Sequence, residues 1–287
     1  MHFAARRITA HLVASALILA VVGTAPGATA ATSIARMAAV EPSALKAQAS
    51  AAIGANNTEN PRALGIARAV TGAISASSQP TTTFTDLKGV QWAAPAIAVL
   101  AQEAILDGTA PHTFNPDGDI SEAQVVTVVR RLLGAPKAPN TGQTPPNTPE
   151  WARSSLLWAT HTKLLVGIPL PTNPTAAITR EQAIAILLNG IGLESLANSA
   201  RAMESPLSLA GSPEPWAHGY LVLAVDLGLI QGDEGSLDAR QALSRAELSV
   251  ILARICAVEA TAGTTAAHSA QGSGLGSGIT TPPLAGS

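Results

Sequence analysis

The sequence predicts an all-α fold in which three tandem helix–loop–helix units pack as a pseudo-threefold bundle. The first observation is compositional, because alanine is abundant while aromatic residues make up only 3% of the chain. Such a composition favours closely packed helices with few large aromatic anchors. The second observation is a repeat: three Trp-Ala pairs are each followed, at the same interval, by a glycine. The tryptophans and glycines are Trp92 and Gly108, Trp151 and Gly167, and Trp216 and Gly232.

Residues 1–30 have the features of a secretory signal peptide. Arg6 and Arg7 precede a largely apolar run from Leu12 to Val22, which is too short to span a bilayer. The small residues Ala28-Thr29-Ala30 then predict cleavage before Ala31. We expect no later segment to span a membrane. Because a signal peptide directs export, we expect the mature protein to be exported.

Residues 31–79 form an Ala-rich segment with modest helical patterning around Arg62 to Ile74. We expect part of this segment to be helix and part to be linker. It carries almost no candidate catalytic groups. It is also the candidate contact for a protein partner.

The first unit is predicted over residues 80–135. Its first helix has an apolar stripe that begins at Trp92 and runs to Ile105. Asp107-Gly108 is predicted to end this helix, because glycine readily adopts the left-handed conformation that closes helices. The loop over residues 109–120 carries two prolines and a glycine, so we expect it to be irregular.

The second helix of each unit is predicted to begin with a capping box, in which a hydroxyl residue and the residue three positions later satisfy each other's amides. The three matches are Ser121-Glu122-Ala123-Gln124, Thr179-Arg180-Glu181-Gln182 and Ser244-Arg245-Ala246-Glu247. They place the second and third units at residues 149–194 and 212–260. One helix pair cannot bury its apolar face alone, so the units should pack together. The Gly-, Ser- and Thr-rich residues 261–287 are predicted to be a disordered tail.

Several functional classes are excluded or disfavoured by composition and spacing. A net charge of −2 without a basic stripe argues against nucleic acid as a partner. The single Cys256 allows no intramolecular disulfide, and the scattered histidines show no metal-ligand spacing. Asn115, Asp117 and Asp119 imitate the start of a calcium loop, but its required glycine and glutamate are missing. We therefore expect no enzyme activity, no metal and no cofactor.

The spaced residues resemble the S-layer homology domain. The resemblance lies in Phe84-Thr85-Asp86, Trp92-Ala93, Gly108, Phe114-Asn115-Pro116 and the capped helix start, and it extends over about residues 80–260. It implies three tandem domains of an all-α pseudo-trimer that binds secondary cell-wall polysaccharides, often pyruvylated, attached to peptidoglycan. Ligand is then expected in grooves between neighbouring domains.

The family's characteristic polar contact is the arginine of a Thr-Arg-Ala-Glu motif. By position, the resemblance assigns that role to Arg180 and Arg245. The first unit departs from the pattern because Glu122 occupies the arginine position. A groove that depends on that position should be weakened or lost.

The same arginines can be interpreted from physical chemistry. The helix macrodipole disfavours a cation at the first helical position by roughly a few tenths of a kcal/mol. Taken alone, such an arginine is more often solvated or salt-bridged. Two in register favour a shared role, in which free helix-start amides and a guanidinium bind a carboxylate. A pyruvyl ketal presents such a carboxylate.

The other candidate ligand-binding residues have a structural interpretation that we weigh first. For Trp92, Trp151 and Trp216 it is core packing, although an indole face can also stack on a sugar ring. For Gly108, Gly167 and Gly232 it is helix termination, and ligand approach comes second. Ser121, Thr179 and Ser244 are helix caps first, and Thr179 and Ser244 are ligand donors second.

The leading hypothesis is non-covalent anchoring to the bacterial cell wall through an anionic secondary polysaccharide. The alternative is a structural surface-layer or assembly protein whose units make lateral protein–protein contacts. Self-assembly without carbohydrate would favour that alternative.

Overall fold

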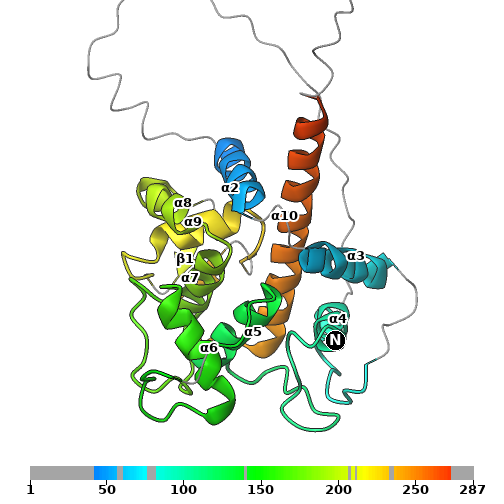
Figure 1. The fold of residues 1–287 in the computed structure, drawn as a ribbon, viewed down its shortest axis with the longest axis vertical. Helices are drawn as coiled ribbons and strands as arrows, with labels where there is room; N and C mark the ends of the chain where they lie inside the picture. The colour runs from blue at the N-terminus through cyan, green and yellow to red at the C-terminus, as the bar shows by residue number, and fades with distance from the viewer. Residues whose placement is uncertain are drawn as a thin grey trace, which may run out of the picture. The chain divides into compact units, whose positions relative to one another are not determined.

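The computed structural model describes residues 42–56, 61–75, 82–138, 141–205, 208–210, 212–232 and 236–272, all of which belong to one compact unit. This part of the chain is mostly helical, which confirms the predicted all-α class (Figure 1). The predicted signal peptide lies outside the described residues. So do residues 273–287 of the predicted tail.

Three pairs of helices correspond to the predicted units. They are α4 (Ala94–Gln102) with α5 (Glu122–Leu132), α6 (Glu150–His161) with α7 (Arg180–Gly190), and α9 (His218–Asp226) with α10 (Arg245–Gly272). Between α7 and α9 lie α8 (Glu194–Ser199), the 3₁₀ turn η1 (Ala200–Ala202) and strand β1 (Ser208–Ala210). Strand β1 pairs in parallel with β2 (Ser236–Asp238).

The first helix of each unit packs against the second helix of another unit, in a cyclic order. Helix α6 packs against α5, α9 against α7, and α4 against α10. The buried apolar side chains of all six helices belong to one continuous core. The unit defined by sequence is therefore not the unit of packing, because each helix buries its apolar face on a neighbour.

A ring of three backbone hydrogen bonds joins the segments just before the capped helices. Ile120 N donates to Leu243 O at 2.9 Å, Leu243 N to Ile178 O at 3.3 Å, and Ile178 N to Ile120 O at 3.0 Å. All three residues are buried. The ring links the units cyclically, while the pseudo-threefold symmetry of whole units remains a prediction.

The predicted capping boxes are confirmed at all three helix starts. In α5 and α7, Ser121 and Thr179 accept from the amides of Gln124 and Gln182, whose side chains accept in return. In α10, Ser244 Oγ accepts from Glu247 N, and Glu247 accepts from Ser244 N.

The first helices end six residues before the predicted glycines. Their closing left-handed residues are Ala104 with φ 52°, Lys163 with φ 59° and Gly228 with φ 70°. Each donates to the carbonyl three residues back, and the next amide donates five residues back, as in a Schellman motif. The prediction that Gly108, Gly167 and Gly232 terminate these helices is therefore wrong.

Two helices from the Ala-rich segment cover the last helix. These are α2 (Pro42–Asn56) and α3 (Pro61–Ser75), and both pack against α10 (Figure 1). Leu45 and Ile53 of α2 and Ile66 of α3 are almost fully buried. Helix α10 continues to Gly272, beyond the boundary expected at residue 260. None of the described helices combines the length and apolar character needed to cross a membrane.

Candidate functional site

One cavity of about 910 Å³ receives residues from all three units. Trp92 comes from the segment before α4, Arg180 from the start of α7, and Gly232 from the segment that follows α9. Three of the predicted site residues therefore meet at one cavity. Its volume lies in the range of small-molecule binding sites. We call it the Arg180 cleft.

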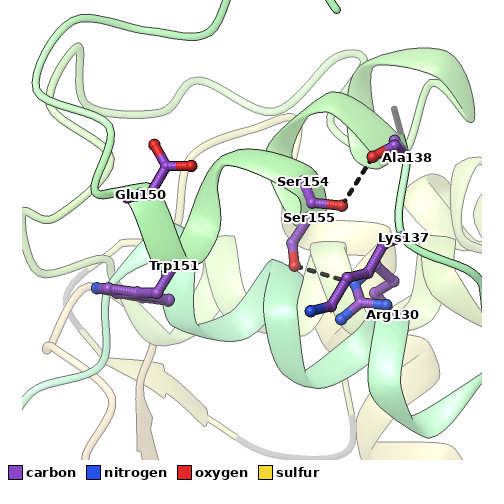
Figure 2. A pocket seen from close by; sticks show the side chains of 7 residues that line it. All are labelled: Arg130, Lys137, Ala138, Glu150, Trp151, Ser154 and Ser155. Atoms are coloured by element: carbon purple, nitrogen blue, oxygen red, sulfur yellow. Dashed lines mark hydrogen bonds between the residues drawn. The ribbon is translucent and has the colours of Figure 1, made fainter. Parts of the chain in front are cut away.

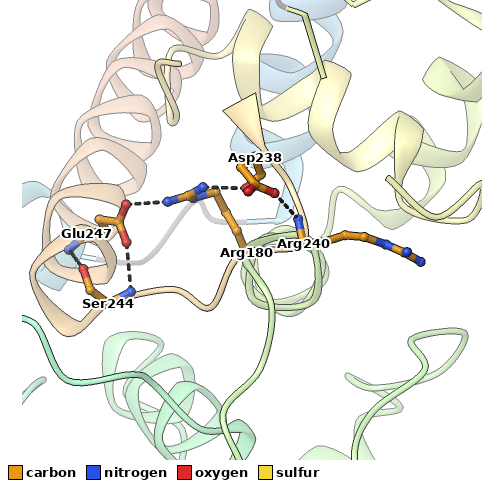
Figure 3. Close-up of polar contacts among 5 residues, drawn as sticks. All are labelled: Arg180, Asp238, Arg240, Ser244 and Glu247. Carbon is orange, nitrogen blue, oxygen red and sulfur yellow. Dashed lines mark hydrogen bonds and ion pairs between the residues drawn. The ribbon is translucent and has the colours of Figure 1, made fainter. Parts of the chain in front are cut away.

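The Arg180 side chain is only 10% exposed and is held by two contacts. Its Nη1 donates to the Asp238 carbonyl oxygen at 2.5 Å, and its Nη2 pairs with Glu247 Oε1 at 2.5 Å (Figure 3). A guanidinium carries five N–H donors. These two contacts leave donors for a further acceptor in the cleft.

Glu247 has two roles at once. One carboxylate oxygen accepts from the Ser244 amide at 2.9 Å and completes the capping box of α10, while the other pairs with Arg180. Figure 3 shows this carboxylate lying between the two groups. The residue that caps one unit therefore neutralises the arginine of another.

The helix-start amides are not free, which differs from the expectation drawn from sequence. At α7, the amides of Arg180 and Glu181 donate to the carbonyls of Gln241 and Ala239. At α10, those of Arg245 and Ala246 donate to carbonyls in the loop of the first unit. The cap hydroxyls of Thr179 and Ser244 take the next amides. Neighbouring units thus use the groups that were expected to bind an anion.

Arg245 occupies the same position in its unit as Arg180, but its side chain is buried in the protein. The residue is 3% exposed, and its guanidinium carbon sits 4.6 Å from the centre of the Phe114 ring. Nε donates to Phe114 O at 2.9 Å and Nη2 to Asp107 O at 2.5 Å. Burial lowers the pKa of Arg245, whereas the nearby carboxylates of Asp107 and Asp86 oppose that change. Arg245 thus holds the loop of the first unit, and a ligand role for it stays a prediction.

Asp86 supports the same loop. Its two carboxylate oxygens accept from the amides of Phe114 at 2.9 Å and Asn115 at 2.7 Å. Burial opposes ionisation, but these backbone hydrogen bonds outweigh it and hold the Asp86 pKa below its usual value.

Arg254 is a cleft residue that sequence reasoning missed. It lines the cavity from α10 and donates to Leu229 O at 3.1 Å and to Gln231 Oε1 at 3.4 Å. Burial lowers the pKa of its guanidinium. The signal was helical spacing, because Glu247, Ile251 and Arg254 share one face of α10.

The prediction of core packing is wrong for two of the three repeated tryptophans. Trp92 is 58% exposed at the Arg180 cleft, and Trp151 is 56% exposed at a smaller pocket (Figure 2). Trp216 does pack against the core, with its ring 6.3 Å from that of Tyr220. The indole faces of Trp92 and Trp151 therefore remain accessible.

The three repeated glycines are needed for two different reasons, close packing and a positive φ. A Cβ on Gly108 would lie 2.6 Å from both the Phe84 ring and Thr113 O. A Cβ on Gly232 would lie 2.3 Å from Ser236 O, so only glycine fits there at the cleft wall. Gly167 instead has open space around it and a φ of 79°, which glycine adopts without strain.

The arrangement defines a class of protein: a helical repeat module with a cavity between its units. Two guanidiniums and an exposed indole surround a partly apolar cavity wall. Within the described residues, no group of three or more His, Cys, Asp or Glu side chains is placed to hold a metal ion.

The family model of the S-layer homology domain matches residues 83–126. The match begins just before Asp86 and ends inside α5, so this part of the chain resembles an S-layer homology domain.

Similar proteins share a longer region with this chain. A cell surface protein of Thermoanaerobacter kivui is 28% identical over 192 residues, which are 64% of this chain and 23% of that protein. A surface-layer 125 kDa protein of Lysinibacillus sphaericus is 24% identical over 62% of this chain and 15% of its own length. An amylopullulanase of Thermoanaerobacterium thermosulfurigenes is 24% identical over 59% of this chain and 9% of its own. The chain thus spans less than a quarter of each of these relatives.

Proposed function

We propose that the protein is exported and anchors non-covalently to the bacterial cell wall by binding an anionic, pyruvylated secondary polysaccharide in the Arg180 cleft. The observation that carries the proposal is the meeting of Trp92, Arg180 and Gly232, one from each unit, at one cavity. The surface proteins among the relatives support the cell-surface location.

The chemistry of the cleft suits a sugar that bears a carboxylate. Arg180 offers its remaining donors, and Arg254 places a second guanidinium on the same cavity. Charge-assisted hydrogen bonds of this kind contribute roughly 1.5–3 kcal/mol. The exposed indole of Trp92 offers an apolar face on which a sugar ring can stack. Carboxylate and ring would then be recognised together.

The test is co-sedimentation of the protein with purified cell-wall sacculi, with and without chemical removal of the secondary polymer. We expect Arg180→Gln to weaken binding at least tenfold, which corresponds to about 1.4 kcal/mol. Arg180→Lys should recover only part of the loss, because lysine keeps the charge but not the planar fork.

Arg240→Gln is the matched control. This arginine lies close to the cleft, but its side chain points away and pairs with Glu214 (Figure 3). The substitution Arg240→Gln removes the same charge as Arg180→Gln and should leave binding to the sacculi unchanged. Equal retention on sacculi without the polymer would refute the carbohydrate partner, and concentration-dependent self-assembly without carbohydrate would favour the assembly alternative.

The same assay separates the two arginines. Arg245→Gln should mainly lower stability, because the guanidinium holds Phe114 and Asp107 in the interior. If folded Arg245→Gln protein loses affinity as strongly as Arg180→Gln, the ligand role expected for Arg245 holds as well.

A further inference from the structure

Helix α2 packs on the bundle through a narrow stripe of apolar side chains. It contacts α8, α9 and α10 (Figure 1), and its buried residues are Leu45, Ala49 and Ile53. These three are spaced four residues apart, so they lie on one face of the helix. Only two of them are large. An element held by so few buried apolar contacts can open without the rest of the core.

The contact between α2 and α9 brings together two isolated charges. Lys46 is the one charged residue of α2, and Asp226, the last residue of α9, is the one carboxylate of that helix. Asp226 Oδ2 is buried and has no hydrogen-bond partner among the described residues. The C-terminal end of a helix also carries partial negative charge, which disfavours a carboxylate there. Asp226 is therefore an acid in unfavourable surroundings.

Lys46 is the charged group that acts on Asp226. Burial raises the pKa of the Asp226 carboxyl, and the positive charge of Lys46 opposes that change. The other elements beside α9 are α7, α8 and η1, and Arg254 of α10 donates to the nearby Leu229 carbonyl. Within the described part of the chain, the remaining ionisable groups around α9 do not contribute to this shift. They are His218 and Tyr220 of α9 itself, Arg180 and Glu181 of α7, Glu194 of α8, Arg201 of η1, and Arg254 and Glu259 of α10.

We propose that α2 is a pH-sensitive strap, which docks on the bundle more tightly when the Asp226 carboxyl is protonated than when it is ionised. Because α2 packs against the helix that ends at Asp226, its release gives water access to the carboxylate. Lys46 is itself exposed, so solvent screens its charge and the attraction replaces only part of the hydration lost on docking.

The direction of the pH effect follows from linkage. With α2 docked, the pKa of Asp226 lies above the ordinary value of 3.8, whereas a hydrated carboxyl titrates near that value. The docked state therefore binds the proton more tightly. Docking is strongest below pH 3.8 and weakens as the pH rises through the raised pKa. At neutral pH the strap is in its weaker state, with an ionised Asp226 near Lys46.

The experiment is hydrogen exchange on the full chain, with amide protection corrected for the intrinsic pH dependence of exchange. We expect the protection of the α2 amides to be at least about threefold higher at about pH 4 than at about pH 7. Helix α3 is the internal reference, because it also packs on α10 and a change in global stability would affect both helices.

Three variants locate the effect. Asp226→Asn should remove the pH dependence of α2 protection, because asparagine is neutral at every pH used. Lys46→Gln should enlarge it by lowering protection at neutral pH alone, since the ionised carboxylate then loses its compensating charge. Asp117→Asn is the matched control: it neutralises an exposed aspartate in the loop of the first unit and should behave as the parent protein does.

The strap is refuted by α2 protection that is constant or rises with pH, or by α3 protection that changes as much as that of α2. Unaltered pH dependence in folded Asp226→Asn protein would overturn the role of Asp226. A smaller pH dependence in Lys46→Gln would overturn the role of Lys46. The measurement uses no carbohydrate, and no residue of α2 lines the Arg180 cleft, so its outcome is independent of the proposed function.

Discussion

At the scale of single residues, the arginine position of the repeat has three different environments. Arg180 is paired with a carboxylate at a cavity, Arg245 lies on the Phe114 ring, and Glu122 is a buried acid. One sequence position therefore supports three different local chemistries. The motif alone could not distinguish them, because the partners come from other units.

Glu247→Gln should raise the affinity of the Arg180 cleft for an anionic sugar. Glutamine can still accept from the Ser244 amide, as Gln124 and Gln182 do at the other two helix starts. The ion pair with Arg180 is lost, so the guanidinium becomes available to ligand, and the fold loses stability because a largely buried cation keeps no charged partner. Binding to sacculi and denaturant unfolding would measure both changes, and weaker binding with an intact fold would contradict this account.

Glu122→Gln should make the protein more stable at neutral pH and not in acid. Glu122 is 3% exposed, and burial raises its carboxyl pKa above the ordinary value of 4.5. The folded state then binds more protons than the unfolded state, so stability falls as pH rises from 4.5 through the raised value. The difference in free energy of unfolding between variant and parent should grow between about pH 4 and about pH 7. A constant difference would show that the carboxyl does not titrate abnormally.

At the scale of elements, the starts of the helices were predictable and their ends were not. Capping boxes are local, so Ser121, Thr179 and Ser244 could be identified from three following residues. The ends depend on backbone conformation, and Ala104 and Lys163 give no sign in sequence of a left-handed residue.

Glycine at these two ends should stabilise the fold. Ala104 and Lys163 are exposed and have positive φ, a conformation that costs an ordinary residue roughly 1–2 kcal/mol. Allowing for the greater flexibility of unfolded glycine, Ala104→Gly and Lys163→Gly should each gain about 0.5–1 kcal/mol. Gly228→Ala should lose a similar amount of stability because of the positive φ alone, since a Cβ there would contact no other atom. Thermal unfolding would check the series, and destabilisation by both glycine variants would refute it.

At the scale of the whole molecule, the all-α fold class could be predicted from the sequence, whereas the way the helices combine could not. Repeated tryptophans and caps mark where helices occur, but they do not say on which neighbour each helix packs. The Arg180 cleft could be anticipated as a groove between units, and Arg180, Trp92 and Gly232 were among its candidates. Arg254 shares one face of α10 with Glu247 and Ile251, but this spacing alone does not say that the face lines a cavity.

The hydrogen bonds among Ile120, Ile178 and Leu243 also have a consequence for how such a chain could grow. Each of these amides donates to the carbonyl of another of the three residues, so the three hydrogen bonds form a closed ring. A fourth copy inserted beside them would find no vacant partner and would leave its own polar backbone groups unmatched in the interior. Duplication of a single copy is therefore disfavoured, and an enlarged version would have to add a complete triplet with its own closed circuit.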